Sequence, residues 1–308
     1  MKADIGKKLK IALGETRLLI LGGQILMGFH LNSAFQSAFG ELSMGSRELH
    51  ACAFLSMICA VGLLIAPSMQ HRIVERGQAS ARILRVTTRF ADWALLPIAL
   101  GLAADLYIVV GFRFGPSWGA GVGVALGVLA LFFWYGAEWL LRQAVRTKDK
   151  SMTAEGETPL DERVEHMLTE ARVLIPGAQA LFGFQLSIFL TESFAKLPET
   201  STLVHVAATC SIAVAVVFLM APAAFHRISY GGYNTEGFLR LGSTFIIAGA
   251  MALAFGIPAD FYVAVSPTTG PQPAALAALA AWGGLLVLWF VAPLIARHRR
   301  NSVSISAP

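Results

Sequence analysis

Two aspartates lie 155 residues apart in similar apolar surroundings, Asp105 in "GLAADLYIV" and Asp260 in "GIPADFYVA" (260 − 105 = 155). Each is followed two residues later by a tyrosine. An ionisable side chain in hydrocarbon is costly unless it has a partner or reaches water, so a repeated one is a candidate functional site. We expect these carboxylates to bind a cation or carry a proton, although interfacial aspartates beside an aromatic belt would show the same pattern.

The same offset links polar residues in the first apolar stretch of each half. They are Glu15, Arg17, Gln24 and Gly28, with copies Glu170, Arg172, Gln179 and Gly183, while His30 lies opposite Gln185. In the first copy Arg17, Gln24 and Gly28 recur at helical spacing and share one face with Leu31. We expect this stripe to face inward as a polar route that starts at Glu15. Hydrogen bonding between packed helices is the structural alternative.

A third repeated motif, Ala-Pro followed by His-Arg-Ile, comes at the end of the second apolar stretch. Its residues are Pro67, His71 and Arg72, with copies Pro222, His226 and Arg227. A proline inside a helix frees a backbone carbonyl and often marks a kink, and a cation at a helix C-terminus complements the helix dipole. We interpret the motif as a cytoplasmic gate or, alternatively, as an anchor.

Histidines near the two ends of the second apolar stretch indicate a different possible function. His50 and His71 recur as His205 and His226. If the two second helices met between the halves, His50 could face His205 and His71 could face His226, as the bis-histidine ligands of a b-type haem. A haem electron carrier is therefore an alternative function.

Other catalytic or metal chemistry finds no support in the sequence. Motifs for zinc, phosphate or dinucleotide binding are absent, and so is a serine-hydrolase motif. The three cysteines, Cys52, Cys59 and Cys210, lie in apolar stretches without metal-ligand spacing. We expect no enzyme activity, no metal and no cofactor.

The composition predicts an all-α integral membrane protein. The chain of 308 residues is 56% hydrophobic and 14% charged, with a mean hydropathy of +0.63. Eight stretches are long enough to cross a hydrocarbon layer of about 30 Å. They lie near residues 18–39, 49–69, 88–111, 119–141, 173–194, 204–225, 241–265 and 273–296.

The basic residues predict the orientation of these helices. Of 24 lysines and arginines, only Arg47, Arg113 and Lys196 fall in the expected outer loops. Cytoplasmic loops are enriched in lysine and arginine, so both termini should be cytoplasmic, in a bacterial inner membrane. The net charge of +5 thus reflects topology rather than a nucleic-acid partner.

The offset of 155 residues extends over whole halves, so we predict a tandem duplication. We expect a four-helix unit at 1–142, a charged cytoplasmic linker at 143–168 with a short helix from Pro159 capped by Thr158, and a second unit at 169–308. Four spans per unit is an even number, so both units should have the same orientation in the membrane. A homo-oligomer is a further expectation.

These motifs also carry a family resemblance. A first helix with "E-x-R…G-x-Q…G-F", a second ending in "AP…HR" and four spans per unit resemble a family of uncharacterised, mainly actinobacterial membrane proteins defined only as a domain of unknown function. Some members are labelled sodium:proton antiporter, so the resemblance implies cation and proton transport. The usual member has a single unit, whereas this chain has two.

We therefore predict an ion-translocating membrane protein, either a channel or a cation/proton exchanger. The two aspartates and Glu15/Glu170 would bind the ion, while Gln24/Gln179 and His30/Gln185 would continue the route. Its partners would be the lipid bilayer and small inorganic ions. The alternatives are the haem carrier and a non-catalytic membrane scaffold, in which the repeated polar residues only hold helices together.

Overall fold

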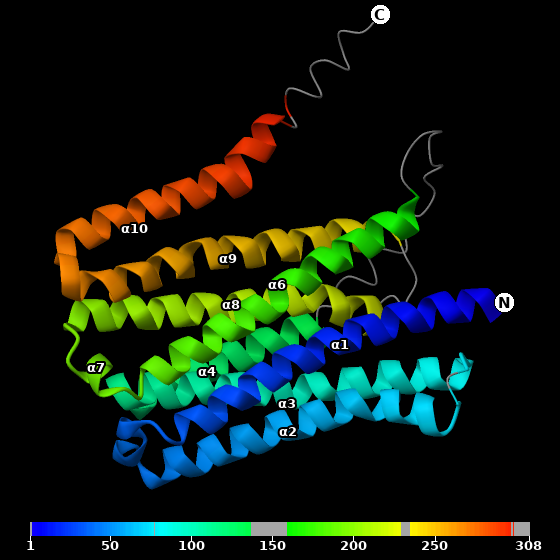
Figure 1. The fold of residues 1–308 in the computed structure, drawn as a ribbon, viewed down its shortest axis with the longest axis horizontal. Helices are drawn as coiled ribbons and strands as arrows, with labels where there is room; N and C mark the ends of the chain where they lie inside the picture. The colour runs from blue at the N-terminus through cyan, green and yellow to red at the C-terminus, as the bar shows by residue number, and fades with distance from the viewer. Residues whose placement is uncertain (1, 77, 137–158, 229–234, 297, 299–308) are drawn as a thin grey trace, which may run out of the picture.

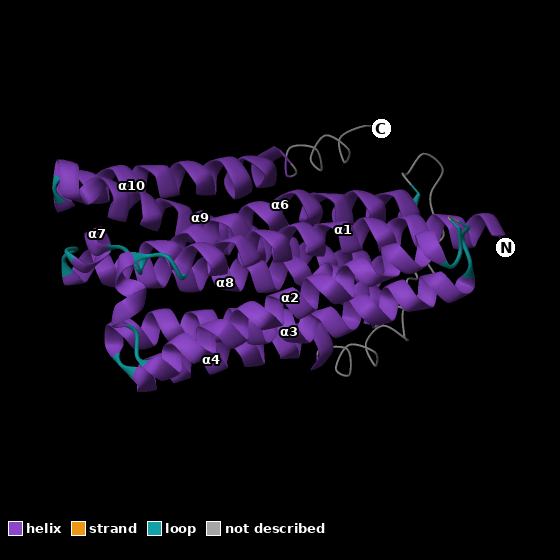
Figure 2. Ribbon diagram, turned by 60° about the horizontal axis from the view of Figure 1, so that its bottom comes forward, coloured by secondary structure: helices purple, strands orange, loops and turns teal. Residues whose placement is uncertain are grey.

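The computed structural model describes the whole chain except residues 1, 77, 137–158, 229–234, 297 and 299–308. Every regular element among the described residues is a helix (Figure 2). The first unit consists of α1 (Lys2–Ser33), η1 (Ser37–Glu41), α2 (Met44–Ile73), α3 (Ala81–Phe114), α4 (Pro116–Leu131) and the π-helical η2 (Phe132–Gly136). The second consists of α6 (Leu160–Ile188), α7 (Glu192–Ala195), α8 (Glu199–Ile228), α9 (Glu236–Thr269), α10 (Pro271–Leu286) and the π-helical η3 (Val287–Val291).

Equivalent local signals start and end the helices of both units. The Ser80 hydroxyl accepts a hydrogen bond from the Ile83 amide at the start of α3, and Thr235 does the same for α9. A glycine with positive φ then ends each of these helices, Gly115 at 99° and Gly270 at 89°, and a proline begins the next helix. Because the same signals recur at the same offset, α9 starts 155 residues after α3 (236 − 81 = 155), and this confirms the tandem repeat.

The structure supports six membrane spans rather than the eight that we predicted. Among the described residues the sufficiently long and apolar helices are Met44–Ile73, Ala81–Phe114, Pro116–Gly136, Glu199–His226, Glu236–Thr269 and Pro271–Ala296. The first helix of each unit is also long, at 32 residues in α1 and 29 in α6, but falls outside this set. Polar side chains such as Arg17, Gln24 and His30 reduce the apolar character of α1. The protein is therefore a multi-pass helical membrane protein with six candidate spans.

The second unit begins earlier than predicted. α6 starts at Leu160 and runs unbroken to Ile188, so the expected short linker helix is the first part of this long helix. Its apolar residues continue at helical spacing through the predicted boundary at 169 and are buried, including Val164, Met167, Leu168 and Ala171. Thr158 and the rest of the linker from residue 143 lie outside the described residues.

α1 and α6 lie side by side and run in the same direction (Figure 1). The rings of Phe29 and Phe184 are 4.7 Å apart, and the Asn32 amide donates to the Ser187 hydroxyl at 3.2 Å. Both contacts join residues 155 positions apart. Neighbouring helices bring equivalent residues together in this way when they are parallel and in register, as a parallel duplication requires.

The fourth helix of the first unit also joins the two units. The Trp134 indole in η2 is buried and donates to the Val217 carbonyl of α8 at 3.0 Å. The Phe133 ring packs 5.2 Å from Phe218 and 5.3 Å from Phe245. The inner edge of the first unit is therefore its fourth helix, and it meets the second helix of the second unit.

Close packing of α4 on α3 depends on glycine. A Cβ added to Gly119 would lie 2.5 Å from the Tyr107 carbonyl oxygen and 2.8 Å from the Gly111 Cα, and both are backbone atoms that cannot move aside. Gly121, on the same helix, has nothing within 4 Å of such a Cβ. The glycine at 119 is thus needed for α4 to approach α3.

We predict that Gly119→Ala destabilises the purified protein by about 1–3 kcal/mol, as expected for overpacking. Gly121→Ala should leave stability unchanged or slightly raised, because alanine favours a helix more than glycine does. Thermal unfolding in detergent, followed by tryptophan fluorescence, measures both. Equal melting temperatures for the two variants would contradict the close α3–α4 contact.

Candidate functional site

Side chains from three helices of the first unit meet in one buried cluster. His30 on α1, His50 on α2 and Asp105 on α3 are each at most 8% exposed. His30 Nε2 lies 3.0 Å from Asp105 Oδ1, and His30 Nδ1 lies 2.9 Å from the Leu26 carbonyl oxygen. His50 Nε2 lies 3.1 Å from the His30 carbonyl oxygen. Residues far apart in sequence thus form a single site.

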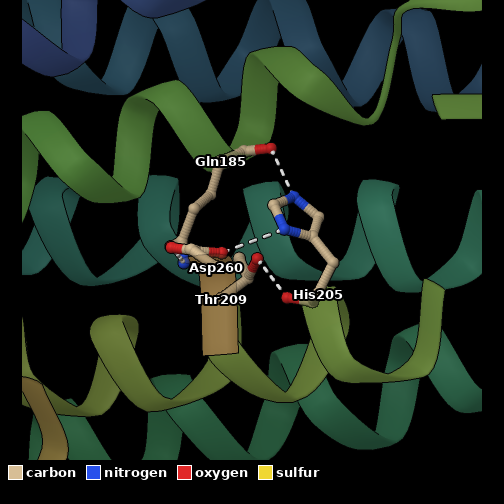
Figure 3. Close-up of polar contacts among 4 residues, drawn as sticks. All are labelled: Gln185, His205, Thr209 and Asp260. Carbon is tan, nitrogen blue, oxygen red and sulfur yellow. Dashed lines mark hydrogen bonds and ion pairs between the residues drawn. The ribbon is translucent and has the colours of Figure 1, made fainter. Parts of the chain in front are cut away.

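The second unit repeats this cluster with a glutamine in place of one histidine (Figure 3). Gln185 on α6 donates to Asp260 Oδ2 at 2.6 Å, and His205 Nδ1 on α8 lies 3.1 Å from Asp260 Oδ1. His205 Nε2 lies 3.3 Å from the Gln185 carbonyl oxygen, the counterpart of the contact between His50 and His30. The Thr209 hydroxyl donates to the His205 carbonyl at 2.8 Å. Asp105 is thus buried in the bundle, and Asp260, whose side chain is 21% exposed, is partly buried.

The hydrogen bonds to carbonyl oxygens decide which ring nitrogens carry hydrogen. A carbonyl can only accept, so His30 Nδ1 and His205 Nε2 must be donors. In a neutral imidazole the other nitrogen has only a lone pair, yet in each unit it faces a carboxylate oxygen at 3.0 or 3.1 Å. Two such acceptors repel unless a proton lies between them. In the second unit His205 Nδ1 and Asp260 Oδ1 meet the geometry of a hydrogen bond, whereas His30 Nε2, although 3.0 Å from Asp105 Oδ1, has no hydrogen-bond partner among the described residues.

An aromatic ring covers each cluster at an equivalent position. The ring of Phe39 lies 5.2 Å from that of His50, and the ring of Phe194 lies 5.2 Å from that of His205. Phe39 and Phe194 are themselves 155 residues apart. The two units therefore protect the same histidine in the same way.

The two clusters differ in how fully their carboxylates are bonded. Asp105 Oδ2 is buried and has no hydrogen-bond partner among the described residues. Beside it lies a cavity of about 20 Å³, lined also by Ser33, Ile108 and Leu186, with room for about one water molecule. Both oxygens of Asp260 have partners instead. The first cluster therefore has a spare acceptor and space next to it.

The first cluster also has donors of the type that hold metal ions. His30, His50 and Asp105 each offer one ligand atom, and these atoms lie within 4.8 Å of one another. Two imidazoles and a carboxylate suit zinc or non-haem iron. Gln185 in place of His30 removes this set from the second unit, whereas a histidine that faces an aspartate recurs in both clusters. The sequence-based expectation of no metal therefore stays our prediction.

Glu15 forms an ion pair between the two units. Its side chain is 3% exposed, and its Oε1 lies 3.2 Å from Nδ1 of His226, in the last turns of α8. The equivalent pair is not formed among the described residues, because Glu170 is exposed and His71 Nε2 is buried without a hydrogen-bond partner. The structure thus brings one predicted route residue and one predicted gate residue together, in one copy only.

The predicted polar stripe faces inward in only one of the two units. On α1 it is exposed, at Arg17, Gln24, Gly28 and Leu31, so our prediction is wrong for the first unit. On α6 the counterparts of its last three members are buried, including Gln179 at 1% exposure. The physical reason is that α6 packs this face on α1, whereas α1 contacts α6 through a different face.

The proline motif lies within continuous helices. α2 passes Pro67 and ends at Ile73, and α8 passes Pro222 and ends at Ile228, so neither helix ends at its proline. Arg72 is exposed in the last turn of α2, where a cation complements the helix dipole. The side chain of Arg227 lies outside the described residues.

The haem alternative needs the second helices to face each other between the units. α1 and α6 make that contact instead, while α2 packs on α1 and α3. His50 and His205 each bind within their own unit, and His226 pairs with Glu15. The geometry therefore gives this alternative no support, and it stays an untested prediction.

Sequence reasoning assigned His50 only to haem and did not connect it with His30 and Asp105. A usable signal was present, since His50/His205 and Asp105/Asp260 are identical pairs at the same offset. All of them lie near the predicted outer ends of their helices. Three helix ends on the same side of a compact unit can place such residues together.

We predict that His30→Gln, which converts the first cluster into a copy of the second, leaves the protein folded. The glutamine amide can donate to Asp105 as Gln185 does to Asp260. Asp105→Ala should be more destabilising, by about 1–3 kcal/mol, because it removes the carboxylate that lies 3.0 Å from the buried His30 ring nitrogen. Thermal unfolding of both variants measures the difference, and a larger loss in His30→Gln would contradict the assigned contacts.

The comparisons with known proteins extend this picture to a family but not to an activity. No curated protein matches the chain, and no solved structure does. A model of a family of unknown function (DUF6328) matches twice, at residues 4–138 and 155–293, once for each unit. The match does not support the antiporter label. The chain belongs to this family of unknown function and contains two copies of its domain in tandem.

Proposed function

We propose that this protein moves protons, or cations in exchange for protons, across a membrane, with one buried His–Asp cluster in each unit as the ion-binding site. The observation that supports this best is that a buried histidine faces an aspartate in both units, with His30 Nε2 3.0 Å from Asp105 and His205 Nδ1 3.1 Å from Asp260. Hydrogen bonds between neutral groups would be enough to hold helices together. A buried acid–base pair is more costly, and in membrane proteins such pairs mark proton and ion pathways.

Polar groups along α1 and α6 supply a route for the ion. Glu15 and His30 are 15 positions apart on α1, about 22 Å at 1.5 Å per residue. Between them, at the level of Gly22, α6 contributes the buried Gln179, whose Oε1 has no hydrogen-bond partner among the described residues. We assign Glu15 and His226 to the cytoplasmic gate, Gln179 to the middle of the route and the first cluster to its outer end.

In this proposal α1 and α6 also cross the membrane, which makes eight spans. Both run alongside the six apolar helices (Figure 1), and their polar side chains would be shielded from lipid by packing. In the same proposal both termini lie in the cytoplasm of a bacterial cell, which the distribution of lysine and arginine among the loops supports. Gln24 and Glu170 are exposed, and they are not part of the route in this assignment.

We predict that Asp105→Asn combined with Asp260→Asn abolishes ion flux without unfolding the protein, because a neutral amide can neither attract a cation nor take up and release a proton as a carboxylate does. The measurement uses purified protein in liposomes with an internal pH dye and an imposed proton gradient. Sodium, potassium or an impermeant cation is placed outside, with chloride or gluconate as the anion. Cation-dependent proton movement indicates exchange, and flux that needs a charge shunt indicates a channel.

The matched control is Glu48→Gln, the same carboxylate-to-amide change at an exposed position of α2 near the clusters. It should retain wild-type flux. Wild-type flux in the double aspartate variant would remove the clusters from the mechanism. Absence of flux in the wild-type protein under every condition would overturn the proposed function.

A further inference from the structure

The surfaces that join the two units have counterparts that are left uncovered. Trp134 of η2 is 2% exposed and donates to Val217, which is fully buried on α8. One repeat away, Trp289 of η3 is 36% exposed and makes no hydrogen bond within the described residues. Gly62 on α2, the counterpart of Val217, is also exposed. One copy of this contact is thus formed and the other is open on both sides.

The face of α6 that packs on α1 shows the same difference. Gly183 packs so tightly against Phe29 that an added Cβ would lie 1.7 Å from the phenylalanine ring. Leu186, on the same face of α6, is 7% exposed. The counterparts on α1 are bare, since Gly28 has nothing within 4 Å of an added Cβ and Leu31 is 54% exposed. This face of α1 lacks the cover that α6 receives.

The surface of α1 that packs on α6 is buried, whereas the equivalent surface of α6 is exposed. Gly22 is buried against Gln179. Its counterpart on α6, Gly177, is exposed and has nothing within 4 Å of an added Cβ. The second unit therefore leaves uncovered the surface through which the first unit contacts it.

The free surfaces belong to opposite sides of the chain. The first unit exposes α2 and one face of α1, and the second exposes α10 and one face of α6. In Figure 1, α10 and α2 lie at opposite edges of the molecule, so they cannot cover each other within one chain. A contact that joins unlike surfaces in this way can be repeated from copy to copy.

We propose that copies of this chain assemble head to tail in the membrane, with α10 and α6 of one copy packed on α2 and α1 of the next. The contact between copies repeats the contact between the two units. It gives the Trp289 indole a carbonyl partner near Gly62. It also gives the exposed Gln24 amide the buried environment of Gln179, and in lipid that amide would otherwise lack a hydrogen-bond partner.

A disulfide test in native membranes uses two differently tagged copies without native cysteines, one with Gly62→Cys and the other with Trp289→Cys. Co-expression followed by mild oxidation should give a dimer that contains both tags. The control replaces Gly62→Cys by Leu100→Cys, because Leu100 and its counterpart Phe255 are both exposed and lie outside the proposed contact. No dimer from the first pair, with both thiols reactive to a maleimide, or equal dimer from both pairs would overturn the proposal.

A second test needs no cysteines. Gly28→Leu with Gly62→Leu should leave each chain folded, since neither glycine has atoms within 4 Å of an added Cβ, but should block the contact between copies. Gly121→Leu is the matched control, because that glycine is equally open but lies elsewhere on the surface. Native mass spectrometry should show oligomers for the wild type and the control and single chains for the double variant. Single wild-type chains, or oligomers of the double variant, would contradict the assembly.

Discussion

The pairing of a buried histidine with a buried aspartate is the interaction on which the rest of each unit depends. An aspartate alone inside an apolar bundle would be strongly destabilising. His30 offsets that cost for Asp105, and His205 with Gln185 does so for Asp260. These partners come from different helices, so the ends of those helices must meet at one point in each unit. The helix caps and the Gly-Pro turn between the third and fourth helices set the helix boundaries on either side of that point.

The two units place their clusters on equivalent helices but build them from different side chains. In the first, two imidazoles and a carboxylate border a small cavity, and one carboxylate oxygen has no hydrogen-bond partner among the described residues. In the second, the glutamine amide fills that role and both oxygens are bonded. The carboxylate of the second cluster is thus held by a more complete set of contacts. The units have become chemically unequal while the fold has stayed the same, which allows unequal ion affinities in the proposed transport.

Contacts between the units explain why identical residues have different environments. The first unit presents its fourth helix, and the second receives it on its second helix, so the contact joins unlike surfaces. Glu15 finds His226 across this boundary, while Glu170 stays exposed. Gln179 is buried and Gln24 is exposed for the same reason. Polar residues that look equivalent in the repeat thus serve one contact inside the chain and leave another free.

The amino-acid sequence by itself determined the membrane class, the tandem repeat and the pairs of polar residues, because these follow from composition, from the 155-residue offset and from the cost of polar groups in hydrocarbon. It also placed Asp105 and His30 among the candidates. Only the tertiary structure joined His50 to them, because the three residues are on separate helices and the repeat shows that each recurs, not that they meet. Only the tertiary structure decided which copy of each stripe is buried, because a repeat gives both units the same faces and packing covers just one of them.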